Sequence, residues 1–148
     1  FNLEVWDESA FERICPGKAK WVGRAAWIRA LEEAVEVFGA NDVMTAFVGG
    51  VEIDGPNAMT PDQALESAIE AGEYLIPRGI QPLYSLYWRT TGQNRGEEPA
   101  YTLPLFLQIN EALAGIRRRE NMTINMDFLS KRGAYMQLEP DYDSAIVS

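Results

Sequence analysis

Apolar residues change their spacing regularly along the chain, and this alternation predicts the order of the secondary-structure elements. Short apolar runs at 1–6, 43–48, 80–88 and 123–129 have the length and composition of strands. The segments between them repeat apolar residues every three or four positions, as a helix does when one of its sides is buried. The predicted order is therefore a strict alternation of strand and helix, with four strands.

Three longer helices are predicted, and their ends carry recognisable signals. The first spans 24–38 and is followed by Gly39, which suits the left-handed position after a helix. The second starts at Thr60, which is placed to form a capping box with Gln63. The third spans 104–120, and the arginines near its end suit the negative end of the helix dipole.

The remaining segments are shorter or less regular. One or two helical turns are predicted at 7–14, and the run Cys15-Pro16-Gly17-Lys18 is expected to stop them. The polar stretch 91–101 lacks periodicity and has the character of an active-site loop. Residues 131–148 are expected to form an irregular C-terminal tail.

The alternation predicts an α/β fold with a parallel sheet, right-handed crossovers and helices on the outside. Residues 1–130 would supply four strands and their helices, which amounts to about half of an eight-stranded TIM-type barrel. The same elements could also form a small open sheet on their own. Because the chain begins inside a predicted strand, we expect it to be a fragment or one half of something larger.

Composition and charge narrow the classes of function. The chain has 148 residues, 47% of them hydrophobic, which is enough for one core. Its formal charge of −9 argues against nucleic-acid binding, which depends on basic residues that neutralise phosphates. No apolar run reaches the about 18 residues of a membrane span, and no basic-then-apolar leader opens the chain. The single cysteine, Cys15, fits a reducing compartment, so we expect a cytoplasmic protein.

The residue types that are missing also limit the chemistry. The chain contains no histidine, which excludes a Ser-His-Asp triad and histidine-rich metal sites. With one cysteine and no Cys-x-x-x-Cys-x-x-Cys spacing, the chain alone cannot hold an iron–sulfur cluster through several thiolates.

Polar residues, aromatic residues and glycines gather near the ends of the predicted strands. In a parallel sheet these ends share one rim, where α/β folds place their sites. A carboxylate with an amide can bind a ribose diol, an arginine can hold a carboxylate, and glycine backbone beside aromatic rings suits a purine. These properties match a nucleoside joined to an amino acid. The candidate residues are Asn2, Glu4, Arg24, Phe47, Val48, Gly49, Gly50, Glu52, Tyr84, Tyr87, Asn125 and Asp127.

The order and spacing of these motifs resemble the C-terminal half of the core barrel of radical S-adenosylmethionine enzymes, in a layout similar to biotin synthase. Asn2-Leu3-Glu4 resembles the end of the family's fourth strand, which binds the ribose and its surroundings. Arg24 matches the arginine that holds the carboxylate of S-adenosylmethionine in the biotin synthase group. The resemblance therefore implies that Glu4 and Arg24 contact the cofactor.

Two further segments extend the resemblance. Phe47-Val48-Gly49-Gly50-Val51-Glu52 resembles the fifth-strand element that packs on the adenine, although Thr45 replaces its first glycine and Phe47 its isoleucine. The run 80–88 falls on the sixth strand, where Tyr84 and Tyr87 would complete the adenine pocket. Because side chains alternate along a strand, Tyr84 and Tyr87 cannot both face the barrel interior unless the strand twists or bulges.

The resemblance implies two cofactors, S-adenosylmethionine and a [4Fe–4S] cluster. The cluster would reduce S-adenosylmethionine to a 5′-deoxyadenosyl radical, which abstracts hydrogen from a small-molecule substrate, and the protein would supply positioning and exclude water. The family's cluster motif lies in the first barrel half, so a missing N-terminal half or a partner chain is implied. Asn125 and Asp127 share one side of the last predicted strand and are candidates for substrate contact.

Other interpretations of the same residues stay open. Glu4 and Glu52 could be the paired carboxylates of a barrel hydrolase, and the chain could be a non-catalytic half-barrel that pairs with another chain. Gly49 and Gly50 could serve close helix–strand packing. Glu52 could brace its loop, and Arg24 could be an exposed residue at a helix start.

Overall fold

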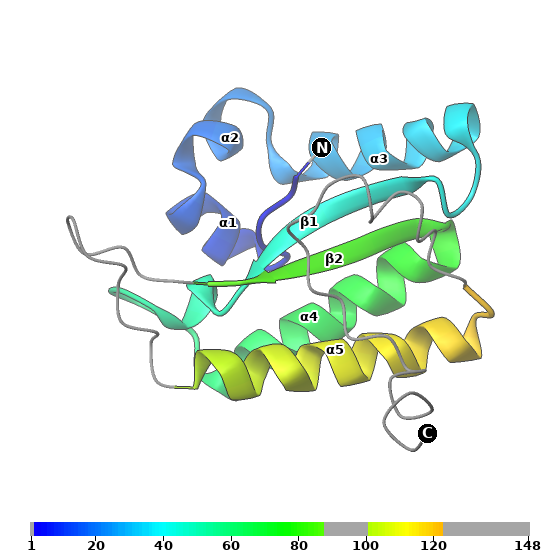
Figure 1. The fold of residues 1–148 in the computed structure, drawn as a ribbon. Coiled ribbons are helices and arrows are strands. Elements are labelled where there is room, and N and C mark those ends of the chain that lie inside the picture. Colours follow the sequence, from blue (N-terminus) through cyan, green and yellow to red (C-terminus); the bar gives the residue numbers. More distant parts are fainter. Residues whose placement is uncertain (1, 88–100, 123–148) are drawn as a thin grey trace, which may run out of the picture.

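The computed structural model describes residues 2–87 and 101–122 of the chain, and Figure 1 shows their arrangement. Helices and two strands alternate along most of this length, which makes a mixed α/β fold. In chain order the elements are α1 (Glu8–Ile14), α2 (Pro16–Trp21), α3 (Arg24–Phe38), β1 (Val43–Gly49), the 3-10 turn η1 (Val51–Ile53), α4 (Pro61–Leu75), the 3-10 turn η2 (Ile76–Arg78), β2 (Ile80–Leu86) and α5 (Thr102–Arg119).

β1 and β2 form a parallel two-stranded sheet. The pairing is continuous, from Val43 opposite Ile80 to Gly49 opposite Leu86. Parallel neighbours need a crossover, and α4 provides it, as the alternation of the sequence predicts. The described residues therefore contain a partial β/α unit, and they do not include a closed barrel.

The predicted strand at 1–6 is wrong in extent. Within residues 2–6, only Glu4 pairs with the sheet, through a single parallel bridge to Phe47. Its backbone bends at this point, with φ of +73°, and Asp7 already caps α1 three residues later. A residue in the left-handed region cannot continue a regular strand. Residues 2–6 therefore contribute buried side chains, but they do not form a continuous ladder of backbone hydrogen bonds with β1.

The helical turns predicted at 7–14 are confirmed as α1, which ends at Ile14 with Cys15 as its C-cap. The sequence analysis did not predict the second helix, α2, which Pro16 begins directly afterwards. Proline is tolerated at the first helical position, because the N–H that it lacks would have no partner within the helix. The capping box at the start of α4 is confirmed, with reciprocal hydrogen bonds between Thr60 and Gln63.

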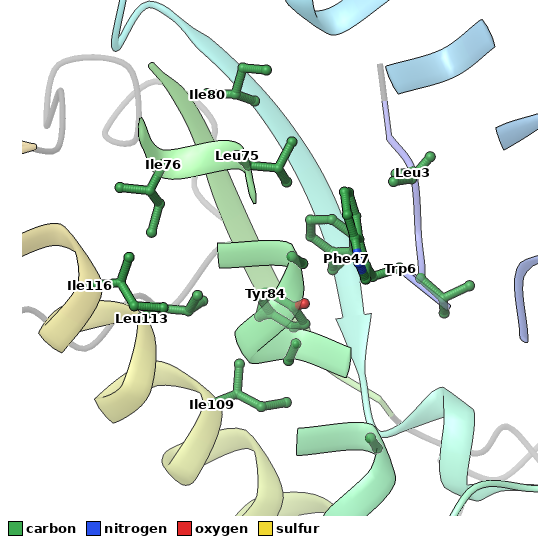
Figure 2. Packing of buried hydrophobic residues seen from close by; sticks show 14 of the residues in the cluster. Leu3, Trp6, Phe47, Leu75, Ile76, Ile80, Tyr84, Ile109, Leu113 and Ile116 are labelled. Carbon is green, nitrogen blue, oxygen red and sulfur yellow. The ribbon is translucent and has the colours of Figure 1, made fainter. Parts of the chain in front are cut away.

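The core lies between the sheet and its helices, and Figure 2 shows its centre. The ring of Phe47 stacks on that of Tyr84 with 4.8 Å between centroids, and both are buried. A Cβ atom added at Gly49 would meet Tyr84, Phe106 and Ile109, so this side of the sheet faces α5. Because side chains alternate along a strand, Val48 faces the opposite side.

α4 connects the helices to one another. Its Gly72 lies against α5, where an added Cβ would come within 2.4 Å of Leu113. At the other side, Tyr74 of α4 donates a hydrogen bond of 2.7 Å to Glu32 of α3. Figure 1 shows α4 and α5 side by side along the sheet. These contacts hold α4 against both α3 and α5.

Some sequence expectations concern residues outside the described part of the chain. They are the fourth strand at 123–129 with Asn125 and Asp127, the tail 131–148, and most of the loop 91–101. Within residues 2–87 and 101–122, none of the helices combines the length and the hydropathy that crossing a lipid bilayer requires.

Candidate functional site

A pocket of about 470 Å³ opens between the N-terminal segment, the α1–α2 corner and the end of β1. It contains a carboxylate, an ammonium group and a thiol on an otherwise apolar wall. The pocket therefore combines charged groups with a surface that can cover a ring. Its lining residues are Glu4, Ile14, Cys15, Pro16, Gly17, Lys18, Val48 and Val51.

The backbone holds Glu4 at the edge of the sheet. The N–H of Glu4 donates to the carbonyl of Ala46, and its own carbonyl accepts from the N–H of Val48, both at 2.9 Å. These two bonds keep a non-glycine residue at φ of +73°, which is an unfavourable conformation. Such backbone strain is concentrated at functional sites. The result is a carboxylate directed to the pocket beside Val48.

Lys18 is the cation of this pocket, and the sequence analysis did not identify it. Its Nζ atom lies 2.6 Å from Oε1 of Glu4 and donates to the carbonyl of Asn2 at 2.9 Å. Asn2 thus contributes its main chain to the charged cluster. The position of Lys18 depends on α2, a helix that the sequence analysis did not predict. Proline as a first helical residue, followed by Gly-Lys-Ala-Lys, was the signal that could have revealed it.

Cys15 occupies the corner between α1 and α2 and contributes to the pocket wall. Burial raises the pKa of its thiol, and the neighbouring Lys18 acts in the opposite direction. Ile14, Val48 and Val51 supply the apolar part of the wall. The thiol is thus a neutral group at neutral pH that lies close to both charges.

The two glycines after β1 serve close packing. Gly50 adopts φ of +102°, and a Cβ atom there would lie 2.6 Å from Cγ2 of Thr102. At Gly49 a Cβ atom would lie 3.2 Å from the ring of Tyr84. Both positions therefore have a structural reason for glycine in the described chain. Neither glycine is among the described residues that line the pocket.

Glu52 is buried beneath the loop that follows β1. Its side chain is 3% exposed, and its Oε2 atom accepts the N–H of Gly50 at 3.0 Å. Burial raises its pKa to about 7, although that hydrogen bond and the charge of Arg13 act in the opposite direction. Arg13 also donates to the carbonyls of Glu52 and Asp54, which ties α1 to the loop. The geometry therefore gives Glu52 a bracing role.

The two tyrosines are separated, as the alternation of a strand predicts. Tyr84 is buried in the core, and its burial, with a smaller effect of Glu52, raises its pKa well above the usual value. Tyr87 follows β2 and donates a hydrogen bond of 2.9 Å to Oδ2 of Asp54. Phe47 is fully buried against Tyr84. The structure thus brings Phe47 and Tyr84 together in the core, away from the Glu4 pocket.

Arg24 begins α3 and is bound to Trp6. Its Nε atom donates to the carbonyl of Trp6 at 2.5 Å, and its guanidinium carbon lies 4.3 Å from the centroid of the Trp6 ring. Among the described residues, the lining of the Glu4 pocket includes neither Arg24 nor Glu52. The two carboxylates of the hydrolase hypothesis, Glu4 and Glu52, therefore do not share this pocket.

A metal site is not evident in this part of the protein. Within residues 2–87 and 101–122, no three acidic or cysteine side chains are grouped so that they could hold a metal ion. Together with the single cysteine of the sequence, this gives the chain no set of ligands for a [4Fe–4S] cluster.

Comparison with known proteins gives one distant relative. The chain is 23% identical over 116 residues to a bacteriochlorophyllide c C-7(1)-hydroxylase of Chlorobaculum limnaeum, an alignment that covers 78% of this chain and 26% of the relative. The chain thus spans about a quarter of the length of this curated relative. No family model matches the chain. No solved structure gives a significant match.

Proposed function

We propose that this chain is the C-terminal part of a radical S-adenosylmethionine enzyme and that the Glu4 pocket binds the cofactor. The observation that carries the proposal is the position of Glu4. The carboxylate of the Asn2-Leu3-Glu4 motif lies beside the end of β1 and lines a pocket of about 470 Å³. In the superfamily that the motif resembles, this residue type binds ribose.

The distant relative supports a role of this class. The hydroxylase is named for oxidation at one carbon of a bacteriochlorophyllide, a change that replaces a C–H bond by a C–OH bond. Radical S-adenosylmethionine chemistry acts on its substrate by abstracting the hydrogen of a C–H bond, so the similarity agrees with a radical S-adenosylmethionine-related role. The order of Asn2-Leu3-Glu4, Arg24 and the segment 47–52 along the chain supports the same class.

The residues present fit the nucleoside part of S-adenosylmethionine. The Glu4 carboxylate would accept hydrogen bonds from ribose hydroxyls, since a charged acceptor makes short, strong bonds. Val48 and Val51 would cover an apolar face of the ligand. The resemblance implies that Arg24 binds the carboxylate of the cofactor. When bound beside a cluster, the cofactor supplies the hydrogen-abstracting group, and this chain's share is binding, orientation and exclusion of water.

The residues do not fit the iron–sulfur cluster. One cysteine cannot replace the several thiolates that such a cluster needs. We therefore propose that the cluster is held by an N-terminal barrel half or by a partner chain. The substrate is a small molecule in this proposal, and Asn125 and Asp127 remain candidates for contacting it.

Substitution of Glu4 tests the cofactor site. Glu4→Gln keeps the size of the side chain and removes its charge, and a hydrogen bond to a charged group contributes about 1.5–3 kcal/mol. The affinity for S-adenosylmethionine, measured by equilibrium dialysis, is expected to fall about tenfold or more. Glu66→Gln is the matched control, because Glu66 is exposed on α4 and the change in net charge is the same.

Two results would count against the proposal. The first is a wild-type chain that does not bind S-adenosylmethionine, either alone or together with the part that carries the cluster. The second is an equal affinity of the Glu4→Gln variant and the wild type, which would remove Glu4 from the site.

A further inference from the structure

We infer that Lys18 binds the negatively charged group of the ligand in the Glu4 pocket, and that the contact between Glu4 and Lys18 is the ligand-free form of this site. The inference deepens the proposed function, on which the identity of the ligand rests. It identifies a binding residue that the motifs of the sequence do not include.

The geometry of Lys18 is consistent with an ion pair to Glu4 that a ligand can replace. Its Nζ atom lies 2.6 Å from Oε1 of Glu4 and donates to the carbonyl of Asn2. The side chains of Lys18 and Glu4 are 32% and 25% exposed, so solvent reaches both charges. An ion pair that is this exposed contributes little to stability and can be exchanged for contacts to a ligand.

The chemistry of the pocket determines the class of ligand. Glu4 can accept hydrogen bonds from hydroxyl groups or an amine, while Lys18 can bind a carboxylate. A ligand that offers both kinds of group to the pocket replaces the two partners at once and leaves neither charge unpaired. A nucleoside that carries an amino-acid end has these groups, and its ring would face Val48 and Val51.

Arg24, the other candidate cation, is differently placed. Its guanidinium group lies over the Trp6 ring, and its Nε atom already donates to the carbonyl of Trp6. Lys18 also lies near an aromatic ring, with its Nζ atom 5.3 Å from the centroid of Trp27, but unlike Arg24 it is one of the described residues that line the pocket. The two assignments can be separated by experiment, because each predicts a different variant that loses affinity.

Cys15 provides a direct probe of the charge in this pocket. It is the single cysteine of the sequence, and it lines the pocket together with Lys18. Its rate of reaction can be measured with a negatively charged aromatic disulfide, dithiobis(nitrobenzoate), and with the uncharged dithiodipyridine. The ratio of the two rates reports attraction of anions, because the fraction of ionised thiol affects both rates alike.

In Lys18→Met, the rate at which Cys15 reacts with the anionic reagent, divided by its rate with the neutral reagent, is expected to fall severalfold. Lys20→Met is the matched control, because Lys20 lies on the same helix, loses the same charge and is placed over the Trp21 ring. Its ratio is expected to stay at the wild-type value. An unchanged ratio in Lys18→Met would overturn the inference without any reference to S-adenosylmethionine.

Two ligands then test the assignment of the carboxylate. S-adenosylhomocysteine carries the amino-acid end, and methylthioadenosine lacks it. Protection of Cys15 from alkylation gives the affinity of each. For Lys18→Met we expect about a tenfold loss of affinity for S-adenosylhomocysteine and a change of less than about twofold for methylthioadenosine.

The outcomes separate the inference from the proposed function. A loss confined to S-adenosylhomocysteine in Lys18→Met supports both. Equal losses for the two ligands, or a selective loss in Arg24→Met only, overturn the role of Lys18 and leave the proposed function standing. If neither ligand protects Cys15 in the wild type while the reagent ratio still depends on Lys18, the proposed function fails and Lys18 remains an anion-binding residue.

Discussion

The carboxyl group of Glu52 is buried just after β1 and accepts the N–H of Gly50. Burial raises its pKa from 4.5 to about 7. The folded protein therefore holds this proton up to a higher pH than the unfolded chain does. The stability that protonation provides is complete below about pH 4.5 and is lost as the pH rises through about 7.

Glu52→Gln is expected to remove this dependence on pH. At about 1.4 kcal/mol per pKa unit, the wild type should lose roughly 3 kcal/mol between pH 4.5 and 8 that the variant keeps. The glutamine oxygen can still accept the N–H of Gly50. Urea unfolding across this pH range gives the free energies, with Glu66→Gln as the exposed control. Parallel pH profiles for the wild type and Glu52→Gln would show that the buried carboxyl does not titrate as described.

Gly50 is constrained by both its conformation and its neighbour. Gly50→Ala places a Cβ atom 2.6 Å from Thr102 at φ of +102°. Gly55→Ala is the matched control, because Gly55 has φ of +84° and no atom lies within 4 Å of its added Cβ. Left-handed strain of about 1–2 kcal/mol affects both variants. We expect Gly50→Ala to cost about 1–3 kcal/mol more in unfolding free energy, since overpacking is added. Equal losses would contradict the close contact with Thr102.

Helices α4 and α5 meet at Gly72. A Cβ atom at this position would lie 2.4 Å from Cδ2 of Leu113 and 2.9 Å from Cδ1 of Ile116. Within a helix, alanine is favoured over glycine by about 1 kcal/mol, so propensity alone predicts that Gly72→Ala stabilises the protein. Both neighbouring side chains are buried, however, and have little room to move.

The two helical glycines should therefore respond in opposite directions to the same substitution. Gly72→Ala is expected to destabilise the protein by about 1–3 kcal/mol. Gly115→Ala on α5, where nothing lies within 4 Å of the added Cβ, should stabilise it by roughly 0.5–1 kcal/mol. Thermal unfolding of both variants measures this difference. Stabilisation by both would mean that α4 and α5 pack less closely than described.

The elements with strong local signals were predictable from the sequence. The capping box of Thr60 and the apolar stripe of 24–38 are encoded within a few residues, and the structure confirms both elements. Prediction from the sequence failed where one local signal is compatible with two structures. Proline can end a helix or begin one, and only the packing of the α1–α2 corner decides that Pro16 begins α2.

The candidate site was predictable only in part, for a related reason. Glu4 was identified by its motif, and the structure places it at a pocket. Its bend at φ of +73° depends on hydrogen bonds to Ala46 and Val48, which are distant in sequence. Lys18 was missed because its place at the site depends on α2. The sequence shows that side chains alternate between the two sides of a strand. It does not show which side of the sheet packs against the helices, so the burial of Phe47 and Tyr84 in the core was not predicted.

At the scale of the whole molecule, the described parts make one core with a charged pocket at its edge. The sheet, α4 and α5 bury Phe47 and Tyr84, and the Glu4 pocket lies on the side of Val48. This arrangement separates the residues that stabilise the fold from those that are available to a ligand. It leads us to place the nucleoside against Glu4, Cys15 and Val48, and not against the two stacked rings.

The most direct test of this account is to map the ligand on the backbone. Titration of the isotope-labelled chain with S-adenosylhomocysteine, followed by amide chemical shifts, locates the contact without relying on activity. We predict saturable shift changes centred on Glu4, Cys15, Lys18 and Val48, which are strongly reduced in Glu4→Gln and retained in Glu66→Gln. Saturable shifts centred elsewhere, or shifts that are unaffected by Glu4→Gln, would contradict the assignment of the nucleoside to this pocket.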